Sequence, residues 1–515
     1  MNPPSHRSST RREFLYNTGR IAAVSALAGT VVPHVHAAES NTIQVALIGC
    51  GGRGTGATIN ALSAKDPTTS VPDGNIKLVA MADAFQDRLD RSHKTLASQF
   101  EGGKQIDVPA DRQFVGLDAY QQAMDCLKPG DVAIFATPPA FRWVHFDYAI
   151  KKGLNVFMEK PVSVDGPTSR RMLKLADESE KKGLKVGVGL HSRHARHMQQ
   201  LAEQLGEGKI GDILLIQAYR MQDSYQRAAK TAKMSDLEYQ IRKFLLFLWA
   251  SGGVYSDYNI HAIDNCCWMK GASLGKESLW PVRAMGLGGR HYRENSMDQN
   301  FDSYAVEYAF ADGTKMIMGG RCISGCEVIL HIYAHGTKGS AVVAKTGECG
   351  APCSIHTGQL PAPEKKVWES SYSPVQQVQQ GLVPYQTEWD DLIAAIRADK
   401  PFNEARRGVE ASLVTSMGRI SAHTGHTVTY EELLNSPYEY APNLDKLTFD
   451  SPAPVMPDAN GKYPVPQPGI ITNVEYQLPH VTVQSTKAAE SDAEMKALVA
   501  KKRAQKDAQQ AKPKN

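Results

Sequence analysis

The sequence is poor in cysteine, carries little net charge and has no long uninterrupted hydrophobic run. Eight cysteines in 515 residues do not make a disulfide-stapled scaffold. Cys266 and Cys267 are adjacent in a predicted helix, where we expect buried thiols. The formal net charge is +4, with much of the positive charge in the two tails, which indicates no nucleic-acid partner. No stretch reaches the roughly 20 apolar residues that cross a bilayer, so we expect no membrane span after processing.

The remaining cysteines leave two interpretations open. Cys322 and Cys326 share a C-x3-C spacing with Cys349 and Cys353. The four thiols could hold a metal, but no neighbouring histidines complete a familiar ligand pattern. A disulfide between Cys349 and Cys353 is the alternative, and the spacing alone does not decide it. We predict no metal site.

The first 38 residues have the features of an export signal. Residues 10–15 read Thr-Arg-Arg-Glu-Phe-Leu, an apolar stretch follows over 21–32, and small residues follow near Ala37. This order is typical of a twin-arginine signal peptide, which carries folded proteins out of the cytoplasm. We therefore predict a signal peptide over 1–38 and a periplasmic or extracytoplasmic location. An amphipathic arm that happens to contain two arginines is the alternative.

Short buried strands alternate with helices in the segment that follows. Strand–helix alternation of this kind is typical of an α/β domain whose parallel sheet is covered on both faces. We predict a Rossmann domain over 39–190. Its expected strands are 42–48, 76–82, 131–136, 155–158 and 185–190, and its expected helices are 88–100, 117–127, 141–152 and 168–182.

From residue 191 the pattern changes to strands joined by short glycine-containing links. This pattern of strands and short links predicts an α+β domain over 191–435 with a large, open and mostly antiparallel sheet. Residues 436–485 are rich in proline and predict an extended strap, and residues 486–515 predict a charged Ala/Lys-rich tail. The expected strands are 213–219, 303–310, 315–319 and 328–334, and the expected helices are 386–398 and 409–424.

A glycine-rich loop directly after the first strand predicts a dinucleotide site. The segment Gly49-Cys50-Gly51-Gly52-Arg53-Gly54 fits G-x-G-x-x-G and precedes a predicted helix. In this pattern the first glycine allows a tight turn, the second lets the backbone approach the pyrophosphate, and the third allows close helix–strand packing. The N-terminus of the helix then offers free N–H groups to the phosphates. We assign Gly49, Gly51, Gly52, Arg53 and Gly54 to cofactor binding.

Asp83 is the expected partner of the cofactor ribose. It ends the second predicted strand, where an acidic residue binds the ribose hydroxyls and disfavours a 2′-phosphate. We therefore expect NAD rather than NADP.

Further motifs resemble those of the glucose–fructose oxidoreductase / inositol dehydrogenase (Gfo/Idh/MocA) family. A strand that ends in Thr137-Pro138 is followed by His145 and then by Glu159-Lys160-Pro161. Downstream lie the segment from Gly252 to Asp264, which contains an Asp-x3-His-x2-Asp pattern, and a turn over 335–340. The resemblance covers about residues 43 to 435.

The resemblance implies a role for several of these residues. Lys160 would hydrogen-bond the reacting hydroxyl beside the nicotinamide, and Glu159 would contact the cofactor ribose. His261 is similar to the family's proton-transferring histidine, and Asp257 to its substrate-orienting carboxylate. Two further residues would line the cofactor cleft, Thr137 and Pro138.

The spacing of Asp257, His261 and Asp264 independently places the three residues on one helix face. An imidazole titrates near neutrality, so we expect His261 to accept a hydroxyl proton there. The alternatives for this face are a structural histidine beside carboxylates and a divalent metal site. His191 and Arg193 leave the last strand of the first domain, where open α/β sheets bind ligands. We assign Asp264, Arg193 and His191 to substrate contact, with a solvated basic helix start as the alternative.

Three functions are compatible with these residues. The first is an exported NAD-dependent oxidoreductase that acts on a CH–OH group of a sugar, cyclitol or glycoside. The second is a redox-neutral NAD-dependent glycosidase with a tightly bound cofactor, but the family resemblance implies that this branch generally lacks the Glu159-Lys160-Pro161 motif. The third is a non-catalytic sugar-binding protein, which the joint presence of Lys160, Asp257 and His261 disfavours. We also expect a homo-oligomer formed through the sheet of the second domain.

Overall fold

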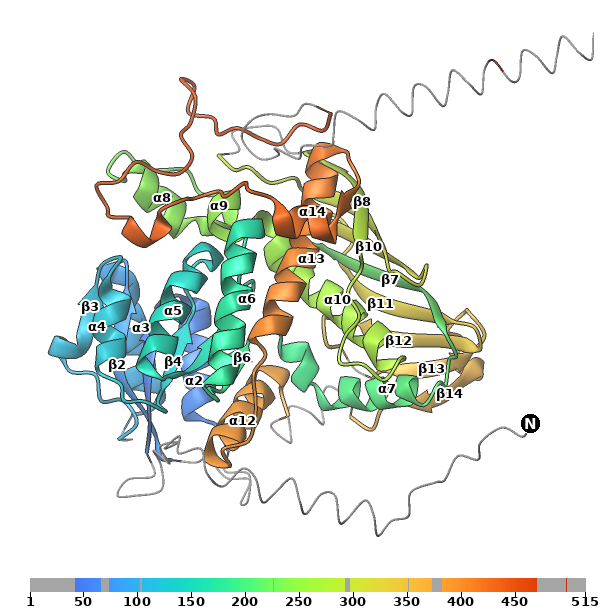
Figure 1. The fold of residues 1–515 in the computed structure, drawn as a ribbon, viewed down its shortest axis with the longest axis horizontal. Coiled ribbons are helices and arrows are strands. Elements are labelled where there is room, and N and C mark those ends of the chain that lie inside the picture. Colours follow the sequence, from blue (N-terminus) through green and yellow to red (C-terminus); the bar gives the residue numbers. More distant parts are fainter. Residues whose placement is uncertain are drawn as a thin grey trace, which may run out of the picture. The chain divides into compact units, whose positions relative to one another are not determined.

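A six-stranded parallel sheet and a nine-stranded mixed sheet organise the computed structural model (Figure 1). The structure describes residues 42–469, apart from 66–73, 102–103, 226, 292–296, 351 and 373–381, and it also describes residue 497. The predicted signal peptide lies outside the described residues, as does the predicted tail apart from residue 497. No helix of the described chain is long and apolar enough to cross a membrane.

The first sheet has the strand order β3-β2-β1-β4-β5-β6, with every pair parallel. Because β1 lies between β2 and β4, the strand order reverses there, and ligands of such sheets bind at the carboxyl ends of these strands. The strands are β1 Ile43–Ile48, β2 Ile76–Asp83, β3 Gln113–Val115, β4 Val132–Phe135, β5 Asn155–Met158 and β6 Val186–Val188. The helices are α2 Gly52–Leu62, α3 Gln86–Gln99, α4 Ala119–Asp125, α5 Arg142–Lys152 and α6 Gly166–Lys181.

The second sheet has the order β14-β13-β12-β11-β7-β10-β9-β8-β15. Its neighbours are antiparallel except for β7 and β10, so the predicted mostly antiparallel sheet is confirmed. Its strands are β7 Ile213–Gln222, β8 Arg283–Gly289, β9 Ser303–Ala309, β10 Lys315–Cys322, β11 Ile329–Gly336, β12 Gly339–Lys345, β13 Ser354–Thr357, β14 Lys366–Glu369 and β15 Val428–Thr429.

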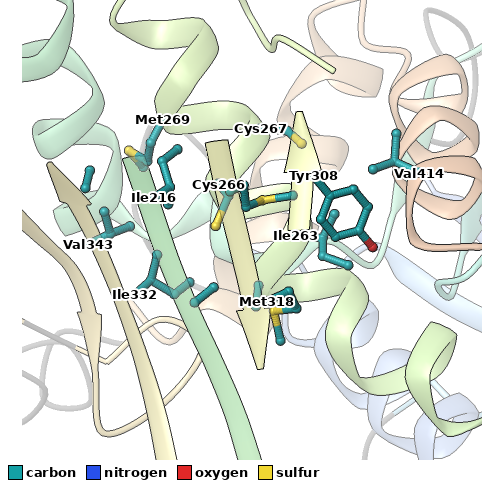
Figure 2. Packing of buried hydrophobic residues seen from close by; sticks show 14 of the residues in the cluster. Ile216, Ile263, Cys266, Cys267, Met269, Tyr308, Met318, Ile332, Val343 and Val414 are labelled. Atoms are coloured by element: carbon teal, nitrogen blue, oxygen red, sulfur yellow. The ribbon is translucent and has the colours of Figure 1, made fainter. Parts of the chain in front are cut away.

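The helix that bears the predicted catalytic residues packs across this sheet. Helix α10, Gly253–Ala272, presents Ile263, Cys266 and Met269 to the inner face (Figure 2). Cys266 and Cys267 are fully buried free thiols, as predicted. Burying a hydrophobic side chain such as Ile263 or Met269 contributes about 1.5–3 kcal/mol, so packing against the sheet helps to fix the orientation of α10. Met318 and Ile332 are among the sheet residues that it contacts.

Later helices connect the two sheets. Helix α12, Pro384–Arg397, lies against α2 (Figure 1) and stacks Trp389 on Phe157 with ring centroids 4.4 Å apart. Helix α13, Ala405–Thr424, contacts α6, α10 and β8. The other helices are α7 Arg196–Gly206, α8 Asp236–Arg242, α9 Leu248–Ser251 and α14 Tyr430–Asn435.

The described part of the predicted strap, 436–469, runs without a strand or α-helix along these helices. Gln240 of α8 donates to the main-chain oxygen of Val455 at 2.5 Å, and Tyr463 packs edge-on against Phe247. The strap is therefore tied to the α8–α9 region by its main chain and by its aromatic side chains.

The predicted strands and helices are present with small shifts at their ends, but five strands of the second sheet were not predicted. In β12 every residue except the last is buried, so the strand shows no alternation of polar and apolar residues. Strand β8 contains three glycines and packs its Gly286 against α13. Close packing on the sheet, rather than local preference, makes these segments strands. The other three unpredicted strands are β13, β14 and β15.

Candidate functional site

The four glycines of the glycine-rich loop differ in the space that surrounds them. Gly49 has φ +99° and a Cβ there would lie 2.6 Å from the main-chain carbon of Ala136. A Cβ on Gly54 would lie 2.0 Å from the oxygen of Gly49. A Cβ on Gly51 or Gly52 would meet nothing within 4 Å. The outer glycines are thus required by packing, whereas the inner two leave open space at the N-terminus of α2.

Asp83 joins this loop to the adjoining pocket. Its carboxylate accepts hydrogen bonds from the main-chain N–H of Cys50 at 2.7 Å and of Phe85 at 2.9 Å. Burial raises the pKa of Asp83 more strongly than these hydrogen bonds lower it. Asp83 also lines a pocket with Thr137 and Pro138. The pocket is mainly apolar and lies at the carboxyl ends of β1, β2 and β4, where a purine ring and its ribose would fit.

Helix α8 closes one side of this pocket through Ile241. Arg242 lies over the Phe85 ring at 3.8 Å and forms an ion pair with Asp87 of α3 at 2.9 Å. Arg88 of α3 donates to the main-chain oxygen of Arg242 at 2.8 Å. These contacts tether α8 across the end of the pocket.

Arg53 links the loop to the Glu-Lys-Pro segment. Its guanidinium donates to Glu159 at 2.7 and 3.2 Å and lies over the Tyr385 ring at 4.4 Å. Burial lowers the pKa of Arg53, but Glu159 outweighs burial, so the pKa is raised overall. Gly189 lets Glu159 lie against the chain, since a Cβ there would be 2.7 Å from Oε2. The two predicted cofactor residues, Arg53 and Glu159, are thus brought together.

Thr137 is held from behind by buried polar groups. Its hydroxyl lies 3.1 Å from Nδ1 of His145, and its main-chain oxygen accepts from Arg142 at 2.9 Å. Burial, assisted by Arg142, lowers the pKa of His145 to about 3. His145 is therefore neutral and positions Thr137 at the pocket wall.

Lys160 extends from the end of β5 to helix α10. Its Nζ donates to the main-chain oxygen of Asp257 at 2.7 Å and to Oδ1 of the same residue at 3.2 Å. His261 lies one helical turn further along α10. The structure thus brings together the three residues predicted as catalytic. Lys160 follows β5 of the first sheet, whereas Asp257 and His261 lie on α10, which packs against the second sheet.

His261 lies in a mostly buried polar cluster. Its ring stands edge-on to the ring of His191 with centroids 4.7 Å apart. Burial lowers the pKa of His261 well below the ordinary value, and the positive charges of Lys160, Arg220 and Arg53 lower it further. The expectation that His261 titrates near neutrality is therefore wrong, because it assumed a solvated ring. The neutral imidazole remains the form that accepts a proton.

Arg193 and Asp264 are turned toward each other. The guanidinium donates to both carboxylate oxygens, at 2.6 and 2.8 Å, and both side chains are almost fully buried. This bidentate pair fixes α10 to the end of β6. Their assignment to substrate contact stays a prediction, while His191 faces the same cluster as His261.

Three residues of the site carry no motif that a sequence search would find. Tyr385 stacks on His191 at 4.0 Å, Arg220 lies over the Tyr258 ring at 5.2 Å, and Glu348 lies beside both histidines. All three come from segments distant from the glycine loop. Within the described chain, none of the four cysteines, Asp257 and Asp264 belongs to a cluster of potential metal ligands, whereas His261 forms one with His191 and Glu348. All eight cysteines are free.

Sequence comparison finds distant relatives with known activities, although no protein-family model matches the chain. Inositol 2-dehydrogenase of Rhizobium meliloti (strain 1021) is 22% identical over 290 residues, which cover 56% of this chain and 73% of that protein. D-glucoside 3-dehydrogenase of Escherichia coli (strain K12) is 26% identical over 197 residues, covering 38% of this chain and 47% of that protein.

Solved structures share the fold over three quarters of the chain. The scyllo-inositol dehydrogenase of Lactobacillus casei with bound NAD(H) and scyllo-inositol matches with a TM-score of 0.53 and 18% identity, over 76% of this chain and 99% of its own. The myo-inositol 2-dehydrogenase of Lactobacillus plantarum matches with a TM-score of 0.54 and 19% identity, over 75% and 99%. The chain therefore has the fold of the Gfo/Idh/MocA dehydrogenases.

Proposed function

We propose that this protein is an NAD-dependent oxidoreductase acting on a CH–OH group of a sugar, cyclitol or glycoside. The observation that carries the proposal is the meeting of Lys160 with Asp257, one turn before His261, at the carboxyl edge of the sheet that bears the glycine loop. The names of the inositol and glucoside dehydrogenases among its relatives support the substrate class.

The residues present fit NAD. The open space at Gly51 and Gly52 suits a pyrophosphate at the start of α2. The buried carboxylate of Asp83 suits ribose hydroxyls and repels a 2′-phosphate. Arg88, the nearest candidate for a 2′-phosphate, already donates to Arg242.

The bound cofactor supplies the hydride acceptor, and the chain's own residues handle the proton. Lys160 donates a hydrogen bond to the reacting oxygen and stabilises its developing negative charge. Asp257 holds the ammonium of Lys160 in place. The neutral His261 accepts the hydroxyl proton as the carbon is oxidised.

The test is NADH formation by the purified chain with a panel of inositols, aldoses and methyl glucosides. We expect cofactor reduction with at least one panel member and none with the Lys160→Ala variant. Reduction that persists in this variant would contradict the proposed site, and binding of sugars without any reduction would favour the sugar-binding alternative.

A redox-neutral glycosidase is the second candidate. Helix α8 is tethered across the pocket lined by Asp83, Thr137 and Pro138, here called the adenosine pocket, and this favours a cofactor that stays bound through each cycle. Native mass spectrometry distinguishes free from retained NAD(H). Release of an aglycone with no net NADH formation would identify the glycosidase, whereas stoichiometric NADH would identify the dehydrogenase.

We also propose export by the twin-arginine route, since a retained cofactor would have to be loaded in the cytoplasm. Replacing Arg11 and Arg12 by lysines should leave the protein in the cytoplasmic fraction.

For assembly, we propose a homo-oligomer through the outer face of the second sheet. Met285 and Leu287 support it, because they alternate with buried Ala284 on β8 and are 56% and 70% exposed.

A further inference from the structure

His191, His261 and Glu348 form a cluster that comes from three separate parts of the chain. His191 follows β6, His261 lies in the middle of α10, and Glu348 lies in the loop after β12. Oε2 of Glu348 is 3.8 Å from Nε2 of His191 and 3.7 Å from Nε2 of His261. One potential ligand atom from each residue lies within 4.8 Å of the other two.

These three side chains face one another without hydrogen-bonding. Separations of 3.7 and 3.8 Å exceed hydrogen-bond length. In the described chain, Nδ1 of both histidines is also buried without a hydrogen-bond partner. A buried polar atom left unpaired costs about 1–3 kcal/mol. The atoms that face Glu348 are the two Nε2 atoms, so the convergence of two Nε2 atoms and one carboxylate oxygen, rather than the unpaired Nδ1 atoms, points to a cation between them.

We propose that His191, His261 and Glu348 bind a divalent first-row transition metal through two imidazole nitrogens and one carboxylate oxygen. Metal–ligand bonds of about 2.0–2.2 Å place tetrahedral ligand atoms about 3.3–3.5 Å apart, so two of the separations need to shorten by only a few tenths of an ångström. Two nitrogens and one oxygen favour zinc, cobalt, iron or nickel over magnesium or calcium. Three protein ligands leave at least one further coordination position open.

The surrounding contacts hold the ligands in place. The other carboxylate oxygen of Glu348 is paired with Arg220, which leaves Oε2 directed at the histidines. Asn265 donates to the main-chain oxygen of Glu348 at 2.9 Å and anchors the loop. Tyr385 stacks on the ring of His191 at 4.0 Å. Outer contacts of this kind orient metal ligands.

The protonation of the cluster also suits a metal. Burial lowers the pKa of His191 to about 3, assisted by Arg53 and Lys160. Burial likewise lowers the pKa of His261. Both rings are therefore neutral at physiological pH, which is the form that coordinates a cation.

The metal site goes beyond the proposed oxidoreductase and competes with one of its steps. A coordinated Nε2 has no lone pair left, so His261 cannot accept a proton at Nε2 in the same molecule that holds the metal. Added zinc should therefore change the rate of substrate oxidation over the same range of zinc concentration that fills the metal site. Metal binding itself is measured without substrate, so it can fail or succeed independently of the redox activity.

The test is equilibrium dialysis of the chelator-treated full chain against Zn²⁺, followed by elemental analysis. We expect one zinc ion per chain. Glu348→Gln and His191→Gln should weaken binding by more than about 100-fold, the upper end of what loss of an outer partner costs. His291→Gln and Glu369→Gln, at exposed positions outside the cluster, serve as matched controls and should bind like the parent.

Cobalt provides a second measurement that does not depend on the variants folding. The parent chain loaded with Co²⁺ should show the visible absorption bands of a four- or five-coordinate nitrogen–oxygen site. Zinc added afterwards should abolish them. Absence of these bands, zinc content far below one ion per chain, or equal binding by parent and Glu348→Gln would each overturn the proposal.

Discussion

The ammonium of Lys160 is bound more closely to the main-chain oxygen of Asp257, at 2.7 Å, than to its carboxylate, at 3.2 Å. The main-chain contact survives any substitution of Asp257. Helix α10 therefore positions Lys160 through its backbone, and the carboxylate tunes that position.

Lys160→Ala should leave NAD binding nearly intact and lower turnover by about 10²–10⁴-fold, the usual contribution of an acid–base group. Asp257→Asn should cost much less, because the main-chain acceptor remains. Steady-state NADH formation measures both, with the exposed Lys174→Ala on α6 as the control. Equal losses in the Lys160 and Asp257 variants would contradict a backbone-held ammonium.

The pH dependence of turnover should have its acid limb well below the ordinary pKa of histidine. Burial and neighbouring positive charges lower the pKa of His261, and His261 accepts a proton only when it is neutral. Activity should therefore be lost as the pH falls through this lowered pKa, and it should be flat across neutrality. The limb should disappear in His261→Ala, measured in the presence of a chelator. A limb near pH 6.5 in the parent would show that the ring is solvated during turnover.

Two glycine substitutions should separate folding from cofactor binding. Gly54→Ala places a Cβ 2.0 Å from the oxygen of Gly49 and should destabilise the fold by about 1–3 kcal/mol through overpacking. Gly51→Ala meets no protein atom within 4 Å, so its unfolding temperature should match the parent. Its NAD affinity should fall, because the methyl group occupies the phosphate space. Thermal unfolding and NAD titration test the pair, and normal NAD affinity in Gly51→Ala would place the pyrophosphate elsewhere.

Arg242→Ala should speed the release of NAD. It removes the ion pair to Asp87 and the contact with Phe85 that hold α8 over the adenosine pocket. The fraction of cofactor that stays bound after gel filtration measures the effect, while turnover at saturating NAD should be preserved. Arg91→Ala, on the exposed side of α3, is the matched control. Unchanged retention would mean that α8 does not close the pocket.

His194 should make stability depend on pH. It lies between Asp391 at 2.8 Å and Glu404 at 3.1 Å. Burial lowers its pKa, but the two carboxylates outweigh burial, so the pKa is raised. Because the pKa of His194 is higher in the folded state than in the unfolded state, its protonated ring stabilises the fold fully at a pH below the unfolded-state pKa. This stabilisation is lost as the pH rises through the folded-state pKa. The difference in Tm between the parent and His194→Gln should be largest near pH 5–6 and shrink toward pH 9. A difference in Tm that stays constant with pH would contradict a raised pKa of His194.

Much of the cofactor side of the site could be predicted because its determinants are local. The glycines of the 49–54 loop and the acidic end of β2 are set by neighbours in sequence and by the turn they must form. Lys160, Asp257 and His261 came from the family resemblance, and the structure brings them together.

The rest depended on long-range packing, which leaves no local signal. Glu348 reaches the histidines because β12, which precedes it, pairs with β11. Tyr385 reaches His191 because α12 returns to the first sheet. The lowered pKa of His261 likewise follows from burial that spacing cannot show. Arg193 and Asp264 were predicted to contact the substrate; in the structure their charges are directed at each other, and the substrate contact stays a prediction.

Helix α12 has a consequence for the order of events during synthesis. Trp389, Leu392 and Ile393 complete the same buried cluster as β1 and α2, so the nucleotide-binding half cannot finish folding until about residue 397 has left the ribosome. A ribosome-bound fragment that ends at residue 190 should leave Phe157 without its stacking partner and remain sensitive to protease. Cofactor capture is then a late event in the synthesis of the chain, and a graft of the first 190 residues onto another protein would need α12 to come with it.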